Sequence, residues 1–359
     1  MSSSRRGKPT LDDVAKAVGV SRATVSNAYN RPDQLSAELR EEVLRQAKQL
    51  GYTGPNPSAR SLATNRTGVV AFMLDAGLSV AFSDPALSIT LDALAAEVDS
   101  AGHSLLLLPG GQDGGPRADR VLAAQADIAV AYALADGASA IQAVKDRGLP
   151  LVVIDQPVTP DSALVRLDDR GGAAAAARHL LELGHRRFGI LSAQCLPVSR
   201  CGPLSAAEAA NSRFHGNRER LAGYLDTLAD AGIAADQVSI WETADFSREH
   251  AMASARGLLE ENNLTAILCM SDELAMATLS VAKQLGLTVP ADLSVVGFDD
   301  TAGARWADPP LTTIRQDLVG KGRLAGELTL SLLAGHPIPA PAILDVELIV
   351  RQSTARAAV

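Results

Sequence analysis

The chain has 359 residues, a formal net charge of −8, and 47% hydrophobic but only 3% aromatic residues. This length predicts two or three compact units, with cores packed mainly by aliphatic side chains. The absence of a run of about 18 apolar residues excludes a membrane span, and the N-terminus lacks the apolar stretch of a secretory signal. We therefore expect a cytoplasmic protein whose three cysteines do not form a disulfide framework.

Charge is distributed unevenly along the sequence. Residues 1–66 contain 11 basic and 6 acidic residues, a balance of +5, whereas the rest contains 22 basic and 35 acidic residues, a balance of −13. A small basic segment on a large acidic body predicts a polyanionic partner for that segment alone.

Residues 10–52 predict three short helices. Thr10, Ser21 and Ser36 each stand where a side-chain oxygen can cap the start of a helix. Thr10 has an acidic residue three positions later, as in a capping box. Gly51 can end the third helix in the left-handed conformation.

The first two of these helices, joined by a tight turn at Gly19 and Val20, predict a helix-turn-helix. The second helix has an apolar stripe, and its opposite face carries small and hydrogen-bonding side chains suited to the edges of bases in a major groove. The stripe is Val25, Ala28 and Tyr29, and the opposite face is Ala23, Ser26 and Asn27 with Arg22 at its start. The alternative interpretation is a small helical bundle with a solvated face.

The polar stretch 53–57 predicts a linker, and residues 58–63 show a short helical pattern. A helix of six or seven residues is not stable alone in water. We expect it to be frayed in the free protein and ordered when two copies pack together on DNA.

From Val69 onward, short apolar runs alternate with helical segments, a pattern typical of parallel sheets covered by helices. Two sets of about four strands predict two lobes. Residues 196–217 are expected to form an irregular loop. The runs are 69–74, 104–108, 128–132 and 151–154, then 188–191, 238–241, 266–270 and 294–298.

Polar side chains follow several of these runs, at the end of the sheet where ligands bind in open α/β folds. They are Asp155, Ser271 with Asp272, and Asp299 with Asp300, while Ser83 and Asp84 lie in the first strand-to-helix connection. Such groups suit the hydroxyls of a sugar or nucleoside.

The sequence resembles the LacI family of bacterial repressors over nearly its whole length. The matching stretches are 10–26, 50–52 and 59–62 at the start, and 179–187, 220–224, 271–275, 289–300 and 311–316 in the body. The resemblance implies a helix-turn-helix headpiece and a sensor domain similar to periplasmic sugar-binding proteins. It also implies that Leu62 wedges into the minor groove, although ordinary packing between domains is the alternative.

Pattern and resemblance together define two sets of candidate residues. The DNA-binding set is Thr10, Ser21, Arg22, Ala23, Thr24, Ser26, Asn27, Asn30, Ala59, Arg60 and Leu62. The effector-binding set is Ser83, Asp84, Asp155, Arg220, Phe246, Ser271, Asp272, Asp299 and Gln316.

We expect a small all-α domain followed by a two-lobed α/β domain with parallel sheets. The predicted divisions are a headpiece at 1–55, a hinge helix and linker at 56–66, and an effector-binding and dimerisation domain at 67–359. Within this domain, we expect an N-lobe of about 67–160 and 317–340 and a C-lobe of about 163–313 and 343–355.

The predicted function is sequence-specific transcriptional repression, with affinity for double-stranded operator DNA controlled by a small-molecule effector. The expected assembly is a homodimer or, alternatively, a tetramer. The sequence leaves open whether the effector releases or tightens DNA.

Other protein classes find little support in the sequence. It has no Walker loop, no HExxH pair and no nucleophile elbow, so we expect no enzymatic activity. Cys195, Cys201 and His215 do not match zinc-ligand spacing, and we expect no metal and no cofactor. A secreted binding protein would share the fold of the body but would need an export signal in place of the basic headpiece.

Overall fold

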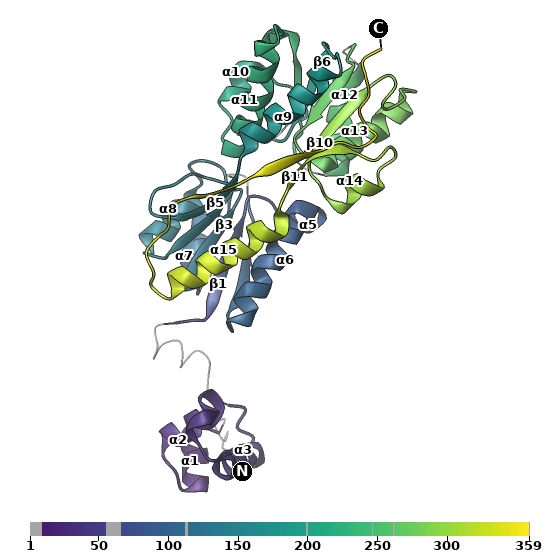
Figure 1. The fold of residues 1–359 in the computed structure, drawn as a ribbon. Helices are drawn as coiled ribbons and strands as arrows, with labels where there is room; N and C mark the ends of the chain where they lie inside the picture. The colour runs from purple at the N-terminus through teal and green to yellow at the C-terminus, as the bar shows by residue number, and fades with distance from the viewer. Residues whose placement is uncertain are drawn as a thin grey trace, which may run out of the picture. The chain divides into compact units, whose positions relative to one another are not determined.

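The computed structural model describes residues 9–54, 66–111, 114–198, 200–245, 247–260 and 263–358. The chain separates into two compact units, Met1–Thr67 and Gly68–Val359, which we call the headpiece and the body. The headpiece is helical, and the body alternates strands with helices (Figure 1). The predicted hinge helix, with Ala59, Arg60 and Leu62, lies outside the described residues.

Local sequence signals position the three described α-helices of the headpiece. Thr10 and Asp13 form the predicted capping box, and the side chains of Ser21 and Ser36 cap the next two α-helices. Gly51 ends the third α-helix with a φ of 74°. These predictions are confirmed. The elements are α1 (Leu11–Val18), α2 (Arg22–Asn30), the 3₁₀ turn η1 (Pro32–Gln34) and α3 (Ala37–Leu50).

The N-lobe contains a six-stranded sheet in the order β12-β5-β4-β3-β1-β2, in which every pair is parallel. Its strands are β1 (Val69–Leu74), β2 (Ser104–Leu108), β3 (Ile128–Tyr132), β4 (Leu151–Ile154), β5 (Ala163–Leu167) and β12 (Ala342–Leu344). Its helices are α5 (Leu78–Ser83), α6 (Pro85–Ser100), α7 (Ala118–Ala123), α8 (Ser139–Asp146) and α15 (Leu318–Leu333).

Both faces of this sheet are buried, which explains why its strands are apolar at consecutive positions. Alternate residues of β1 point into different cores. Phe72 packs with α5, α6 and α15, whereas Met73 packs with α7 and α8 on the other face. The helices therefore cover the sheet from both sides, as the alternation of runs predicts.

The C-lobe contains a seven-stranded sheet in the order β13-β11-β10-β9-β6-β8-β7, parallel except for its two edge strands. Its strands are β6 (Phe188–Ser192), β7 (Gly202–Pro203), β8 (Ser239–Glu242), β9 (Ala266–Cys269), β10 (Ser294–Asp299), β11 (Thr312–Gln316) and β13 (Val346–Ile349). Its helical elements are α9 (Asp169–Glu182), α10 (Ala206–Ala210), α11 (His215–Asp230), η2 (Ala235–Gln237), α12 (Arg248–Glu260), α13 (Asp272–Gln284) and α14 (Ala302–Trp306).

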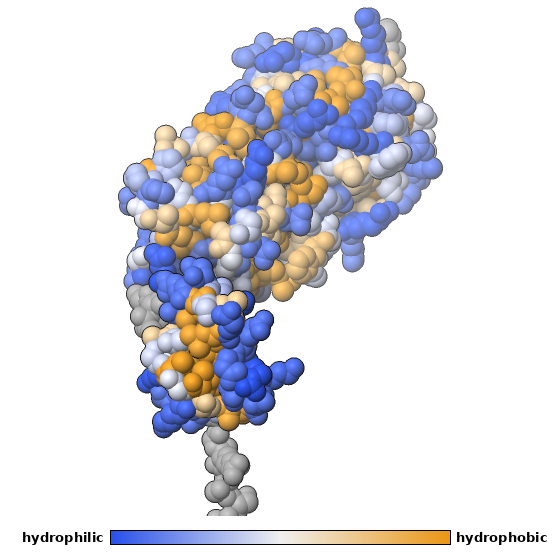
Figure 2. All heavy atoms as spheres, turned by 60° about the horizontal axis from the view of Figure 1, so that its bottom comes forward, coloured by the Kyte–Doolittle hydropathy of each residue, from blue (hydrophilic) through white to orange (hydrophobic). Residues whose placement is uncertain are grey.

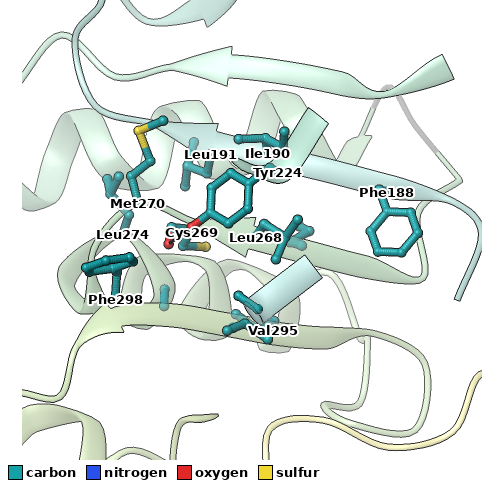
Figure 3. Close-up of a cluster of buried hydrophobic side chains, with 14 of the residues drawn as sticks. Phe188, Ile190, Leu191, Tyr224, Leu268, Cys269, Met270, Leu274, Val295 and Phe298 are labelled. Carbon is teal, nitrogen blue, oxygen red and sulfur yellow. Dashed lines mark hydrogen bonds between the residues drawn. The ribbon is translucent and has the colours of Figure 1, made fainter. Parts of the chain in front are cut away.

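The core of the C-lobe is aliphatic around a few aromatic rings (Figure 3). Tyr224 is fully buried within it, and its hydroxyl donates to the carbonyl of Cys269 over 3.4 Å. Phe298 lies at the end of this cluster nearest the carboxyl ends of the strands, beside Met270 and Leu274. The core thus supports the edge of the sheet from which polar side chains emerge.

The chain passes between the lobes three times, after β5, after β11 and after β12. Because β5 and β12 pair in the N-lobe sheet, the crossovers fall after Leu167 and Leu344, a few residues later than the expected lobe boundaries. Two of the crossovers lead directly into a helix, and in both cases an aspartate side chain caps the start of that helix. Asp168 accepts from the N–H of Gly171 over 2.9 Å, and Asp317 accepts from that of Gly320 over 2.8 Å.

Residues 196–217 differ from the expected irregular loop. They contain the edge strand β7, the short helix α10 and the first turn of α11. Ser205 and Glu208 form a capping box that starts α10, a signal that the proline and glycine residues of this segment obscured. The segment is therefore a folded part of the C-lobe.

No described helix is long and apolar enough to cross a membrane. The face of the molecule drawn in Figure 2 carries hydrophobic and hydrophilic residues interspersed in small patches. Some large apolar side chains are nevertheless exposed on the body, and Trp306 is the most exposed of them at 87%.

Helices α15 and α6 pack closely because Gly322 has no side chain. A Cβ atom at this position would lie 2.2 Å from the carbonyl oxygen of Thr90, which cannot move without bending α6. We predict that Gly322→Ala lowers the free energy of unfolding by about 1–3 kcal/mol, measured by urea denaturation.

The matched control is Arg323→Ala on the exposed side of the same helix, which should change stability by no more than about 0.5 kcal/mol. Equal stabilities of the two variants would contradict the proposed close contact.

Candidate DNA-binding surface and effector cavity

Helix α2 presents the predicted polar face to solvent. Val25 and Ala28 are fully buried against the headpiece core, whereas Arg22 and Ala23 are exposed. Ser26 and Asn27 are partly buried. The predicted stripe is therefore confirmed, and the side chain of Asn30 lies outside the described part of the structure.

Several candidate DNA-binding side chains also hold the headpiece together. Thr10 caps α1, and the Ser21 hydroxyl accepts from the backbone N–H of Thr24 over 3.0 Å. The amide of Asn27 donates to the Gln34 side chain over 3.1 Å. These bonds fix the start of α2 and orient its exposed face.

Arg22 forms an ion pair with Asp12, with 3.0 Å between Nε and Oδ1. Both side chains are exposed, at 73% and 46%, so the pair contributes at most about 1 kcal/mol. The pair can therefore open at little cost. An exposed arginine guanidinium carries the two parallel donors that suit the edge of guanine, and the role of Arg22 in base reading stays a prediction.

The body encloses a cavity of about 760 Å³ lined by residues of both lobes at the carboxyl ends of their strands. This volume suits a small organic ligand. The structure brings six of the nine candidate effector-binding residues to its wall, and their role in binding stays a prediction. They are Asp84, Asp155, Arg220, Ser271, Asp299 and Gln316.

The other three candidates do not line the described cavity. Ser83 ends α5 with its hydroxyl donating to the carbonyl of Val80, so it is exposed outside the wall. Asp272 is buried behind the wall because its carboxylate accepts bonds from Thr301 and Thr313. Phe246 lies outside the described residues.

A chain of hydrogen bonds along the cavity wall joins one lobe to the other. The Lys321 ammonium lies 2.9 Å from Asp155 Oδ2 and donates to Gln316 Oε1 over 2.8 Å. The amide of Gln316 donates in turn to Asp299 over 2.6 Å. We call these four side chains the interlobe relay. Burial and the nearby Asp272 carboxylate raise the pKa of Asp299 well above its ordinary value.

Lys321 was not a candidate from the sequence. It stands in the first turn of an otherwise largely apolar helix, between Gly320 and Gly322, and is 1% exposed. A lysine buried to this extent needs an anionic partner. A lysine between two glycines in an apolar helical segment was the sequence signal that could have identified this buried charge.

A second buried cation stands on the C-lobe side. Arg220 Nε donates to Asp169 over 2.8 Å, its guanidinium also bonds the carbonyl of Met270, and its carbon lies 3.6 Å from the centroid of the Phe298 ring. Burial raises the pKa of Asp169, and the Arg220 charge opposes this rise. The guanidinium is thus fixed on three sides.

Two further carboxylates form the N-lobe wall. Asp84 caps α6 by accepting the N–H groups of Ala86 and Leu87. Burial, with a contribution from Asp84, raises the pKa of Asp75 to about 7. Burial also raises the pKa values of Asp84 and of Glu273, which faces them from the C-lobe. This wall is rich in hydrogen-bond acceptors.

Tyr132 ends β3 and lines the cavity with only 7% of its surface exposed. Its ring stacks on Phe72, and among the described residues its hydroxyl has no hydrogen-bond partner. The hydroxyl is therefore available to bond a molecule bound in the cavity. Tyr132 and Asp75 stand at the carboxyl ends of β3 and β1, as Asp155 does for β4. The search for polar side chains at strand ends would therefore have found both.

Strand ends at the cavity carry strained backbone. Asp155, Asp299 and Asp300 have φ angles of 66°, 125° and 56°, in the region that L-residues rarely adopt. Such strain is held by the surrounding structure and clusters at functional sites. Here it turns the Asp155 and Asp299 side chains towards the cavity.

The segment between β6 and α11 closes one side of the cavity and contacts the N-lobe. The N–H of Asp136 donates to the carbonyl of Arg213 over 2.7 Å, and Arg218 donates to the Asp136 carboxylate over 2.7 Å. The N–H of Gly216 donates to the Gln156 side chain over 2.7 Å. We call these contacts the interlobe latch.

The comparisons with known proteins agree with this geometry. The model of the lacI family of bacterial regulatory proteins matches residues 10–56, and that of the periplasmic binding protein-like domain matches residues 177–354. The HTH-type transcriptional regulator IpsA of Corynebacterium glutamicum is 39% identical over 333 residues, covering 90% of this chain and 91% of that protein.

Two solved structures extend the similarity to the fold. The lac repressor dimer bound to operator and the anti-inducer ONPF is 27% identical, with a TM-score of 0.76 over 97% of this chain and 100% of that one. The complex of the transcriptional regulator CelR with cellobiose is 28% identical, with a TM-score of 0.69 over 96% and 99% of the two chains.

A helix-turn-helix headpiece and a two-lobed body with an internal cavity define a DNA-binding transcriptional regulator with an effector-binding domain. The chain belongs to the LacI family of bacterial regulatory proteins.

The raised pKa of Asp75 predicts a pH-dependent stability. Its folded-state pKa of about 7 exceeds the ordinary 3.8, so this stabilisation is complete below pH 3.8 and is lost as the pH rises through 7. We predict that Asp75→Asn raises the free energy of unfolding at pH 8 relative to pH 5 by on the order of 2 kcal/mol, compared with the wild type.

The measurement is urea denaturation at both pH values. Asp119→Asn removes an exposed carboxylate whose pKa is lowered by its bond with Arg117, so it should not reproduce this gain at pH 8. An unchanged pH profile in Asp75→Asn would refute the assignment.

Proposed function

We propose that this regulator is a repressor whose affinity for operator DNA is controlled by a small hydroxylated effector bound in the body. The observation that carries the proposal is the cavity between the lobes, with its acceptor-rich wall and the unpartnered hydroxyl of Tyr132. The similarity to a regulator solved with cellobiose supports a sugar or a related polyhydroxylated effector. The exposed polar face of α2 supports base reading by the headpiece.

The functional unit is proposed to be a homodimer, because two headpieces match the two half-sites of a pseudo-palindromic operator. The lac repressor, which is similar over 97% of this chain, was solved as a dimer on its operator. Exposed apolar side chains on the body, Trp306 and Phe82 among them, are candidates for burial in that dimer.

Control of DNA binding is proposed to operate through the relative orientation of the lobes. The interlobe relay and the interlobe latch both join the lobes around the cavity, so an effector that favours another orientation has to rearrange them. The effector changes operator affinity only by the difference between its affinities for the two orientations.

Arg22 is expected to contact a base. We predict that Arg22→Ala weakens binding by about 1–3 kcal/mol to a DNA fragment selected from a random library by the wild-type protein. Fluorescence anisotropy at fixed salt measures the affinity.

Arg45→Ala serves as the control, because Arg45 is exposed on α3 and paired with Glu42. Retention of full affinity by Arg22→Ala would show that α2 does not read the operator through this residue.

Effector control is tested with the same DNA fragment. We predict that at least one compound among neutral sugars and nucleosides changes operator affinity by about 5–150-fold, in either direction. Tyr132→Phe should weaken the response to that compound while leaving the affinity without effector unchanged, because it removes only a hydroxyl. Wild-type operator affinity that no compound alters would count against the sensor function.

A further inference from the structure

Two cations at the cavity wall are already neutralised by carboxylates of the protein itself. Lys321 is held by Asp155 at 2.9 and 3.3 Å and by Gln316 at 2.8 Å. Arg220 is held by Asp169 at 2.8 Å and by the carbonyl of Met270. Each buried positive charge therefore has a negative charge of its own within the same wall.

The third cation that lines the cavity is also bonded. Nη2 of Arg213 donates to the carbonyl oxygen of Asp136 over 3.4 Å, as part of the interlobe latch. An anionic ligand would have to compete with a protein carboxylate to pair with Lys321 or Arg220. That exchange is costly, since a buried carboxylate that loses its partner keeps its desolvation penalty.

Acceptors without a cationic partner occupy the rest of the wall. Asp75, Asp84 and Glu273 form no ion pair with any described residue. A phosphate or carboxylate on the ligand would find no cationic partner among these groups, whereas a ligand hydroxyl can hydrogen-bond to them in either protonation state. Asp245 is already paired with His250 at 2.9 Å.

Tyr132 supplies the second, independent observation. Only 7% of the residue is exposed, it lines the same cavity, and its hydroxyl forms no hydrogen bond with a described residue. It can both donate to and accept from a hydroxyl, and it is the neutral group that a polyhydroxylated ligand would satisfy.

We propose that the cavity selects uncharged polyhydroxylated ligands and rejects their phosphorylated or carboxylated counterparts. Asp155 and Asp169 act as built-in counter-ions that keep Lys321 and Arg220 from binding anions. The inference rests on the proposed function, in which this cavity is the effector site, and it assigns the charge of the effector.

The test uses a variant in which the cavity should become an anion-binding site. Asp155→Asn removes the counter-ion of Lys321 but keeps the shape of the side chain. Isothermal titration calorimetry of the full-length protein with inorganic phosphate, and separately with glucose 6-phosphate, is carried out at fixed ionic strength in a buffer without phosphate. We expect at least one of these probes to bind Asp155→Asn at least about tenfold more tightly than the wild type.

Matched control variants show which residue is responsible for the tighter binding of the probes. Asp119→Asn breaks the exposed pair with Arg117 and should bind both probes as the wild type does, including any weak binding to the basic headpiece. Asp155→Asn combined with Lys321→Met should lose the gain. Asp169→Asn frees Arg220 and provides an independent second site if Asp155→Asn fails to fold, which melting and operator binding would reveal.

Three outcomes would overturn the proposal. They are tighter binding of glucose 6-phosphate than of glucose by the wild type, no gain in a folded Asp155→Asn or Asp169→Asn variant, and a gain that persists in the Lys321→Met double variant. Operator binding by the same samples is measured separately, so a failure of DNA binding would count against the proposed function and not against the charge filter.

Discussion

Charge neutralisation inside the body is the constraint on which the arrangement of the lobes depends. The Lys321 ammonium is almost completely withdrawn from solvent, which is tolerable only because Asp155 and Gln316 accept its hydrogen bonds. Those partners come from β4 of the N-lobe and from the end of β11, where the chain leaves the C-lobe. One buried charge therefore ties together the two sheets and one of the three crossovers, and Asp299 extends the connection into the centre of the C-lobe sheet.

The cost of burying an ion pair explains why the relay is a plausible control element and not only a support. A buried pair gains little net stability over apolar packing, but breaking it leaves an uncompensated charge. Two discrete arrangements are consequently favoured over a continuum of intermediate ones. The ion pair of the latch, between Asp136 and Arg218 of α11, is more exposed and is correspondingly easier to open.

The headpiece was predictable from sequence because its signals are local. Caps at Thr10, Ser21 and Ser36 and the left-handed Gly51 fix the described α-helices within a residue or two. In the body, the apolar runs at the centres of the sheets were equally visible. The strands that sequence periodicity missed lie at or near sheet edges, such as β12, where Ile343 is exposed and the apolar run is short. Which sheet an edge strand joins depends on contacts distant in sequence, so the lobe boundaries moved by several residues.

The cavity was predictable in its location and only partly in its composition. Asp155, Ser271 and Asp299 follow from the rule that polar groups after parallel strands converge. Lys321 approaches from a helix that belongs to the N-lobe but follows a C-lobe strand, a relationship that no local pattern contains. Asp272 shows the opposite case, since its position at a strand end is right but its carboxylate turns inward to Thr301 and Thr313.

The path of the chain also determines which parts of the protein can fold first during synthesis. Contacts within the described headpiece all lie before residue 54, so this unit has what it needs to fold soon after it leaves the ribosome. The N-lobe sheet receives its covering helix α15 and its edge strand β12 only when residue 344 has been made. Translation that stops early would therefore release a folded DNA reader attached to a body in which neither lobe is complete.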